Sequence, residues 1–416
     1  MMKQLLTSTV AGIAIIASAS AFADTIKIGM LVTQEGTFTN AGNDGIRGFR
    51  MALDEFDNEV AGKKIEYVIV PTDATPDTVV RQARRAFDQD NVDFIIGPLS
   101  GSEGIALRDF AKTVPDKTII NGISGALETT WVDPAPNFFR FNLDGSQWGS
   151  GLGSYVVNEK GWTRVATIAA DYSFGYTNFL GFALDFCNAG GEIVERFWMP
   201  LGSSDFGSVI AALPDDVDAI YLGVGGTDAI NFLNQYQQAG GDVNLIGGTI
   251  LADQSVLTAR GRAKEALIGT PTSGPQADTS DDPAWTSFVE TYQASFPEAE
   301  RFPTPSLFAT GYYNATKAAL MALEAIDGEL DADQANFHQA LSEVVLDAPN
   351  GRITLDDNRQ AIGTVFVTEV TEGPDGALFN RLVAKVDDVN QTLGLSPEEF
   401  RALGLPSRDT PECIQR

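Results

Sequence analysis

The chain is poor in the residues that most often carry enzyme chemistry. Among 416 residues it has one histidine, His338, and two cysteines. His338 falls in a helical pattern far from the loops that follow strands, so Ser-His or Cys-His catalysis has no obvious base. Zinc-ligand spacing, a GxSxG elbow and a GxxxxGK[ST] phosphate loop are also missing. The sequence therefore predicts a protein that is not an enzyme and holds no cofactor or metal, although an exported α/β enzyme stays open as an alternative.

Basic residues are scarce as well. There are 28 Lys and Arg against 56 Asp and Glu, which gives a net charge of −28. Nucleic acid and anionic lipid are poor partners for such a chain, and a solvated acidic surface is the ordinary interpretation of this excess. Beyond the N-terminus no apolar run approaches the roughly 20 residues of a membrane span, so no direct membrane anchor is expected.

Residues 1–23 have the three parts of a cleavable export signal. Lys3 precedes an apolar run over residues 10–17, and the stretch ends on the small-x-small sequence Ala21-Phe22-Ala23. The next residue is Asp24 rather than cysteine, so a lipoprotein anchor has no attachment point. We expect a periplasmic protein; an ordinary buried helix would leave the AFA ending unexplained.

Two cysteines in an exported protein allow one disulfide. Cys187 lies late in a helical pattern, and Cys413 lies in a Pro-rich tail. Our hypothesis is that they bond and hold the tail against the second half of the molecule, with two free thiols as the alternative.

Strand and helix patterns alternate along the chain, which favours parallel sheets covered by helices. The pattern runs once through residues 25–143 and restarts near residue 144, so we predict an α/β fold with two doubly wound lobes. The Gly/Pro/Ser/Asp-rich segment 269–284 is predicted to cross between lobes in its first part. The expected division is lobe 1 from 24–143 plus about 272–353, lobe 2 from 144–271 plus about 354–392, and a tail at 393–416. The expected strands include 25–32, 64–70, 92–96, 118–120, 164–169, 192–199, 219–223 and 244–246, and the expected helices include 46–56, 77–87, 147–158, 174–187, 206–213 and 228–238.

Ligands of open α/β sheets bind beyond the carboxyl ends of the strands, and two facing lobes would form a cleft there. Loop 97–104, GPLSGSEG, brings Ser100 and Ser102 to the start of a helix, and loop 121–130 repeats the arrangement after the next strand with Ser124. Backbone N–H groups and hydroxyls at these helix starts are suited to a carboxylate. We therefore predict a two-sided anion site on the first lobe; the alternative is that the serines only cap helices.

Aromatic and glycine residues mark two loops of the second lobe. The sequence ADYSFGYTN at 170–178 places Tyr172 and Phe174 after a strand, where aromatic rings wall an apolar ligand, although packing is the simpler role for each ring alone. GVGGTD at 223–228 lacks the third glycine of a dinucleotide loop, so we interpret Gly225 and Gly226 as permitting close backbone approach.

The chain resembles the periplasmic solute-binding proteins of branched-chain amino acid type ABC transporters, which have the type I bilobed fold with a multi-strand hinge. The resemblance implies a monomer that captures a small-molecule solute and delivers it to ABC permease subunits in the inner membrane, without chemistry. A sensor with the same fold, read by a receptor, is the alternative. The likeness rests on residues 26–57, 92–107, 164–182 and 202–241.

The resemblance also implies ligand contacts, residue by residue. The carboxylate-holding serine falls at Gly101 or Ser102, the next loop's contacts fall at Ser124 and Gly125, and the covering aromatic falls at Phe174. Gly226, from the glycine loop of the second lobe, is added to the expected ligand contacts.

Thr249 stands where the family places an acidic partner for the ligand's ammonium group. A buried ammonium without a carboxylate would cost several kcal/mol, so a plain leucine-type ligand is disfavoured. Phe38, Tyr172 and Phe174 together suit an aromatic acid. Asp253, close in sequence to Thr249, could supply a compensating charge and keeps an amino acid open; amides remain in the expected class too.

Overall fold

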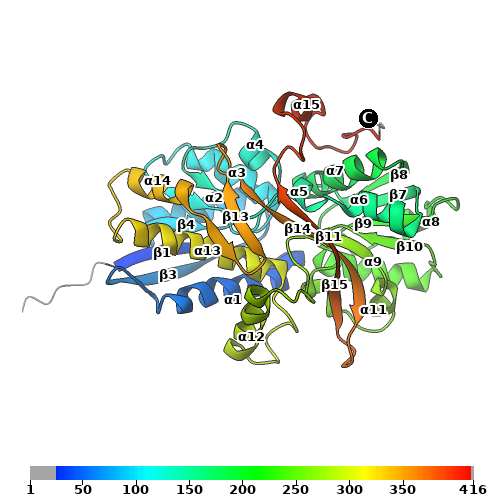
Figure 1. Ribbon diagram of the computed structural model, residues 1–416, viewed down its shortest axis with the longest axis horizontal. Coiled ribbons are helices and arrows are strands. Elements are labelled where there is room, and N and C mark those ends of the chain that lie inside the picture. The colour runs from blue at the N-terminus through cyan, green and yellow to red at the C-terminus, as the bar shows by residue number, and fades with distance from the viewer. Residues whose placement is uncertain (1–24, 414–416) are drawn as a thin grey trace, which may run out of the picture.

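Two α/β lobes lie side by side in the computed structural model, which describes residues 25–413 (Figure 1). The first lobe has a six-stranded sheet in the order β2-β3-β1-β4-β5-β6, parallel except for the short β2–β3 pair. The strands are β1 (Thr25–Thr33), β2 (Glu59–Val60), β3 (Lys63–Thr72), β4 (Phe94–Ile96), β5 (Thr118–Ile120) and β6 (Phe138–Phe139).

The second lobe is built on a nine-stranded sheet in the order β12-β13-β14-β11-β10-β9-β7-β8, with β15 paired to β14. Its parallel core continues into antiparallel strands at the hinge, and the β12–β13 end reaches the core of the first lobe, where Leu346 and Ile353 are buried. The strands are β7 (Arg164–Ala170), β8 (Glu192–Met199), β9 (Ala219–Gly223), β10 (Asn244–Gly247), β11 (Pro271–Gly274), β12 (Leu346–Ala348), β13 (Gly351–Leu355), β14 (Ala361–Glu372) and β15 (Leu378–Val389).

Helices cover both sheets. Those of the first lobe are α1 (Thr39–Glu55), α2 (Pro76–Asp88), α3 (Gly101–Ala111), α4 (Glu128–Trp131), α12 (Pro283–Ser295), α13 (Leu307–Ala325) and α14 (Ala335–Glu343), with the 3₁₀ turn η1 (Gly36–Phe38). Those of the second lobe are α5 (Gly145–Trp148), α6 (Leu152–Tyr155), η2 (Val156–Lys160), α7 (Ser173–Asn188), α8 (Gly207–Ala211), α9 (Gly226–Gln238), α10 (Gln254–Leu257) and α11 (Arg262–Leu267). None of the helices within residues 25–413 is long and apolar enough to cross a membrane.

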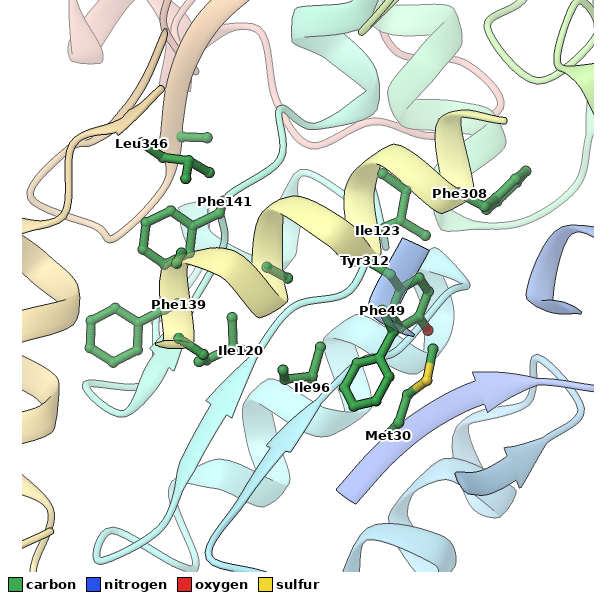
Figure 2. Close-up of a cluster of buried hydrophobic side chains, with 14 of the residues drawn as sticks. Met30, Phe49, Ile96, Ile120, Ile123, Phe139, Phe141, Phe308, Tyr312 and Leu346 are labelled. Carbon is green, nitrogen blue, oxygen red and sulfur yellow. The ribbon is translucent and has the colours of Figure 1, made fainter. Parts of the chain in front are cut away.

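Helix α13 is the central helix of the first lobe. Figure 2 shows side chains from α13, from α1 and from the strand ends gathered in one buried cluster, among them Phe49, Ile96 and Tyr312. The Tyr312 hydroxyl donates to the Leu31 carbonyl at 2.6 Å, so this buried polar group is satisfied while the ring packs. The cluster fixes the strand ends of the first lobe, from which the site loops start.

Three predicted segments differ from the structure. The helix predicted at 46–56 begins earlier, at Thr39. The predicted helix at 147–158 is broken into α5, α6 and η2, because Gly151 has a φ of +80° and a Cβ on Gly149 would lie 2.5 Å from the backbone nitrogen of Phe182. The segment 269–284 begins with β11, a strand of the second sheet, so the crossing toward the first lobe starts after Gly274 rather than in its first part. The predicted export signal at residues 1–23, with Asp24 after it, falls outside the described residues.

The C-terminal segment runs across both lobes. A disulfide joins Cys187, in α7, to Cys413, so the predicted pairing is confirmed. Upstream of it, α15 (Pro397–Ala402) buries Phe400 against Leu127 of the first lobe and Leu180 of the second. The segment after β15 is therefore packed and covalently attached rather than free.

Candidate functional site

The lobes meet at an interface of aromatic side chains, at the place where the cleft between the lobes was predicted. Phe38 of the first lobe and Phe174 and Ile250 of the second belong to one buried cluster, at 3%, 5% and 5% exposed. Tyr172 is half-buried against the same cluster, and its ring centroid lies 6.1 Å from that of Phe174. Phe308 of α13 also joins, 6.5 Å from Phe38. The structure thus brings together the three aromatic residues that the sequence singled out.

Two helix N-termini, one from each lobe, meet at this cleft. Helix α3 begins at Gly101 and α7 begins at Ser173. The hydroxyl oxygens of Ser102 and Ser173 are 3.2 Å apart, and a Cβ on Gly101 would lie 3.0 Å from the Cβ of Phe174. The first N–H groups of a helix have no partner inside it, and its dipole makes that end positive. This arrangement favours an anion between the lobes.

Glycine allows the covering aromatic ring to lie against the first lobe. A Cβ on Gly125 would be 2.9 Å from the Phe174 ring, too close for any larger residue. On its other side Phe174 meets Trp148 edge-on, with ring centroids 5.9 Å apart. The indole nitrogen of Trp148 is buried without a hydrogen-bond partner in the described chain. The Phe174 ring is therefore held between loops of both lobes.

The predicted pair of serine-bearing loops is only partly present. Ser124 donates its hydroxyl to Asn121 Oδ1 at 2.6 Å inside the first lobe, so here its proton is not directed at an anion site. Ser100 caps α3 by accepting from the Glu103 N–H, as the capping alternative stated, and donates to Ala74 O. Of the three serines, Ser102 is the one whose hydroxyl faces the other lobe.

Thr249 lies at the cleft, and the acid nearest to it in sequence is already engaged. The Thr249 hydroxyl accepts from Asn178 Nδ2 at 3.1 Å. Asp253 uses one oxygen to cap α10, accepting from Ser255 N–H, and the other to accept from Leu307 N–H, both at 2.9 Å. Both Asp253 oxygens thus already accept a backbone hydrogen bond, and its part in balancing a ligand's charge stays a prediction.

Residues that the sequence reasoning missed close the other end of the cleft. Thr37 of η1 donates its hydroxyl to Asp228 Oδ1 at 2.9 Å and lies 2.9 Å from the Thr227 hydroxyl. Gly226 contacts Thr37 as well: it has a φ of +55°, and a Cβ added to it would clash with the Thr37 carbonyl oxygen at 2.3 Å. We call this contact of Thr37 with Gly226, Thr227 and Asp228 the latch. The sequence analysis singled out the loop at 223–228, but no local signal indicates that Thr37 meets it.

Buried carboxyl groups shape the electrostatics around Tyr172. Burial first, and then the nearby carboxylates of Asp228 and Glu103, raise the pKa of the Tyr172 hydroxyl, so it remains a neutral hydroxyl at neutral pH. Burial also raises the pKa of Asp228, opposed by hydrogen bonds from Gly202 and Thr37. The cleft therefore has negative groups at its edges and helix N-termini at its centre.

Glu103 gives a pH-dependent prediction. Burial raises its pKa from 4.5 to about 7, opposed by hydrogen bonds from Thr72 and Ser100, and one of its oxygens has no partner in the described chain. Because the folded protein holds this proton more tightly than the unfolded chain, the group lowers stability as pH rises from about 4.5 to 7, by about 3 kcal/mol in total. Glu103→Gln keeps the capping box. We expect urea denaturation to show that the free energy of unfolding of the variant increases relative to that of the parent from pH 5 to pH 8. A difference in unfolding free energy that does not change with pH would contradict this.

A bilobed α/β fold whose strand-end loops meet between the lobes defines the class of type I binding proteins. The chain matches the family model described as periplasmic binding protein over residues 25–376 and belongs to that family. It is similar to the "Leu/Ile/Val-binding protein homolog 6" of Brucella melitensis, with 25% identity over 390 residues, 91% of this chain and 96% of the relative.

Solved structures show the same fold. A solute-binding protein of an ABC transporter from Rhodopseudomonas palustris BisB5, in complex with 3,4-dihydroxybenzoic acid, is 25% identical and superposes with a TM-score of 0.80 over 88% of this chain and 99% of its own. An ABC transporter substrate-binding protein from Sphaerobacter thermophilus is 27% identical with a TM-score of 0.78 over 88% and 99% of the two chains. The predicted family and the type I fold are both confirmed.

Proposed function

We propose that this protein is the extracytoplasmic solute-binding component of an ABC importer. It captures a small carboxylate with an apolar or aromatic body between its lobes and delivers it, unaltered, to permease subunits in the inner membrane. The observation that carries the proposal is the meeting of the α3 and α7 N-termini at Ser102 and Ser173. The proposed ligand contacts are Phe38, Gly101, Ser102, Gly125, Tyr172, Phe174, Gly226 and Thr249.

The helix starts support a carboxylate head group. Two positive helix ends brought together repel each other weakly, and an anion between them turns that repulsion into attraction. Each charge-assisted hydrogen bond from a hydroxyl or N–H group adds to the affinity. Ser102 and Ser173 contact each other across the lobes, so a carboxylate that accepts from both would be held by both lobes and would favour their closure.

The surroundings support an aromatic or apolar body rather than an α-ammonium group. Phe38, Tyr172 and Phe174 supply apolar area, while Thr249 is neutral and Asp253 already accepts a backbone hydrogen bond on each oxygen. The relatives point to both classes: the Brucella melitensis relative is named for Leu, Ile and Val, and the Rhodopseudomonas palustris structure contains a dihydroxybenzoic acid. The geometry favours the aromatic acid.

Thermal melting of the exported chain tests the proposal. The panel contains benzoate and hydroxybenzoates, branched-chain amino acids, short aliphatic acids and neutral amides. A ligand at 100 times its dissociation constant adds about 2.7 kcal/mol of stability, which shifts the melting midpoint visibly. We expect aromatic acids to shift it and the matching amides, which lack the anionic head, to shift it much less. A shift with leucine alone would contradict the aromatic class, and a shift with no anion would contradict the carboxylate site.

Phe174→Ala should weaken binding of the active compound by about 1–3 kcal/mol, because the ring covers the ligand. Phe206→Ala is the matched control: Phe206 is equally buried in the second lobe but belongs to the separate cluster around β9 and α9. Isothermal titration should show reduced affinity for the first variant and parental affinity for the second. Equal affinities would remove Phe174 from the site.

A further inference from the structure

A small cavity of about 20 Å³, with room for roughly one water molecule or ion, lies at the hinge. Side chains from α10, β11 and β15 line it: Gln254, Thr272 and Asn380. These residues are 1%, 3% and 9% exposed, and each has a buried oxygen without a partner in the described chain, namely Gln254 Oε1, Thr272 Oγ1 and Asn380 Oδ1. Three such oxygens around one cavity call for a shared partner, because an unpaired buried polar group costs about 1–3 kcal/mol.

The amide orientations are fixed by their nitrogen atoms. Gln254 Nε2 donates to Asp278 Oδ2 at 2.8 Å, and Asn380 Nδ2 donates to the Ala252 carbonyl at 2.6 Å. Exchanging nitrogen and oxygen in either amide would place an oxygen against an oxygen. The atoms left unpaired are therefore true acceptors.

Two buried carboxyl groups line the same cavity. Asp278 accepts from Gln254, from the Asn380 N–H and from the Thr304 hydroxyl, and Asp253 accepts from two backbone N–H groups. Neither forms an ion pair with a Lys or Arg among residues 25–413. The cavity therefore combines unpaired side-chain oxygens with carboxyl groups that have no ion-pair partner in the described chain.

We propose that this cavity binds one hard cation, Na⁺ or Ca²⁺, through the side-chain oxygens of Gln254, Thr272 and Asn380 beside the carboxylate of Asp278. The Thr272 hydroxyl can donate as well as accept, so one water would satisfy all three groups, but it would bring no positive charge to the two carboxyl groups. Amide, hydroxyl and carboxylate oxygens are the ligands that such ions take, and Mg²⁺ fits less well because it keeps most of its own water. In the described chain no three His, Cys, Asp or Glu side chains form a metal cluster, so this site depends on neutral oxygens.

The ion would join segments that connect the lobes. Thr272 is in the last strand before the crossing, Asp278 lies in the crossing itself, and Asn380 is in a strand that returns to the second lobe. The Thr304 hydroxyl on Asp278 extends the same group toward the start of α13 in the first lobe. A bound cation would stabilise the hinge with or without solute, which makes the proposal separable from the proposed function.

Melting of the metal-stripped full-length exported chain tests the site without any solute. Chloride salts of Na⁺, Ca²⁺, Mg²⁺ and choline are compared at constant ionic strength. We expect Na⁺ or Ca²⁺ to raise the midpoint in a saturable way at concentrations where Mg²⁺ and choline do not, and a competition between the two identifies the ion. Equal midpoints in all four salts would overturn the proposal and would mean that water fills the cavity.

Substitutions at Thr272 separate this site from loose binding to the acidic surface. Thr272→Val keeps the shape but removes the oxygen and should weaken the response to the cation at least tenfold, whereas Thr272→Ser should retain it. Thr129→Val is the matched control, because Thr129 is also a fully buried threonine with an unpaired hydroxyl but does not line this cavity. An undiminished response in Thr272→Val would overturn the proposal, as would a loss of the same size in Thr129→Val.

Discussion

Gly226→Ala is expected to lower the affinity for the solute on the order of 100-fold while leaving both lobes folded. A Cβ at this position would lie 2.3 Å from the carbonyl oxygen of Thr37 in the opposite lobe, so the lobes could not close fully. If the lobes did not close, the latch would lose the hydrogen bond from Thr37 to Asp228 and the one between the Thr37 and Thr227 hydroxyls. A hydrogen bond to a charged group contributes about 1.5–3 kcal/mol, which accounts for the expected loss.

The strain of alanine at positive φ must be separated from the effect on closure. Gly240 provides the control: it follows the C-terminal end of the same helix α9, has a φ of +79°, and a Cβ added there would have nothing within 4 Å. Gly240→Ala has the same backbone penalty of about 1–2 kcal/mol but meets no neighbour across the cleft. We expect isothermal titration to give parental affinity for Gly240→Ala.

Small-angle scattering gives a second readout of the latch. With saturating solute, the parent should become more compact than the Gly226→Ala variant, whose lobes stay further apart. Equal affinity and equal compaction in the two glycine variants would show that the latch does not contribute to the closed form. Thr37→Val, which removes only the hydroxyl, should have a smaller effect of the same sign.

Much of the fold could be predicted because its signals are local. Buried β-branched runs mark β1, β7 and β9, and helical spacing marks α1 and α9, so the alternation of the two indicated both lobes. Where the prediction failed, the cause is tertiary contact. The segment 147–158 has a helical pattern, but Gly149 and Gly151 are required by the close approach of α7, and this breaks the helix.

The site shows the same limit. Phe38, Tyr172 and Phe174 were found because aromatic residues after strands are a visible pattern, and the structure gathers them. A sequence does not show which polar groups already have hydrogen-bond partners. Ser124 and Asp253 carry the right chemistry, yet the Ser124 hydroxyl donates to Asn121 and the Asp253 carboxylate accepts from the Leu307 N–H. The latch was missed for a related reason, since the pairing of Thr37 with Asp228 joins residues 191 positions apart and depends on how the lobes face each other.

The hinge gives the largest expected loss of stability. Arg140 is fully buried where the first lobe leads into the hinge, and its guanidinium contacts Gln360, donates to the Ala126 carbonyl and the Thr130 hydroxyl at 2.6 Å, and lies 3.5 Å from Asp144. Burial lowers the pKa of Arg140 to about 10, opposed by the nearby carboxylates, so the group stays charged at neutral pH.

Arg140→Met should lower the free energy of unfolding by about 3–5 kcal/mol, because it leaves Asp144 as a buried charge without its cation and Thr130 and Gln360 without their partner. Arg164→Met is the matched control: Arg164 forms two ion pairs, with Glu192 and Asp216, but its side chain is 39% exposed. Exposed pairs contribute about 0–1 kcal/mol, so the control should remain close to the parent in urea denaturation. If the number of ion pairs decided stability, Arg164→Met would lose more unfolding free energy than Arg140→Met. That outcome would show that the buried network at residues 140, 144 and 360 does not hold the hinge together.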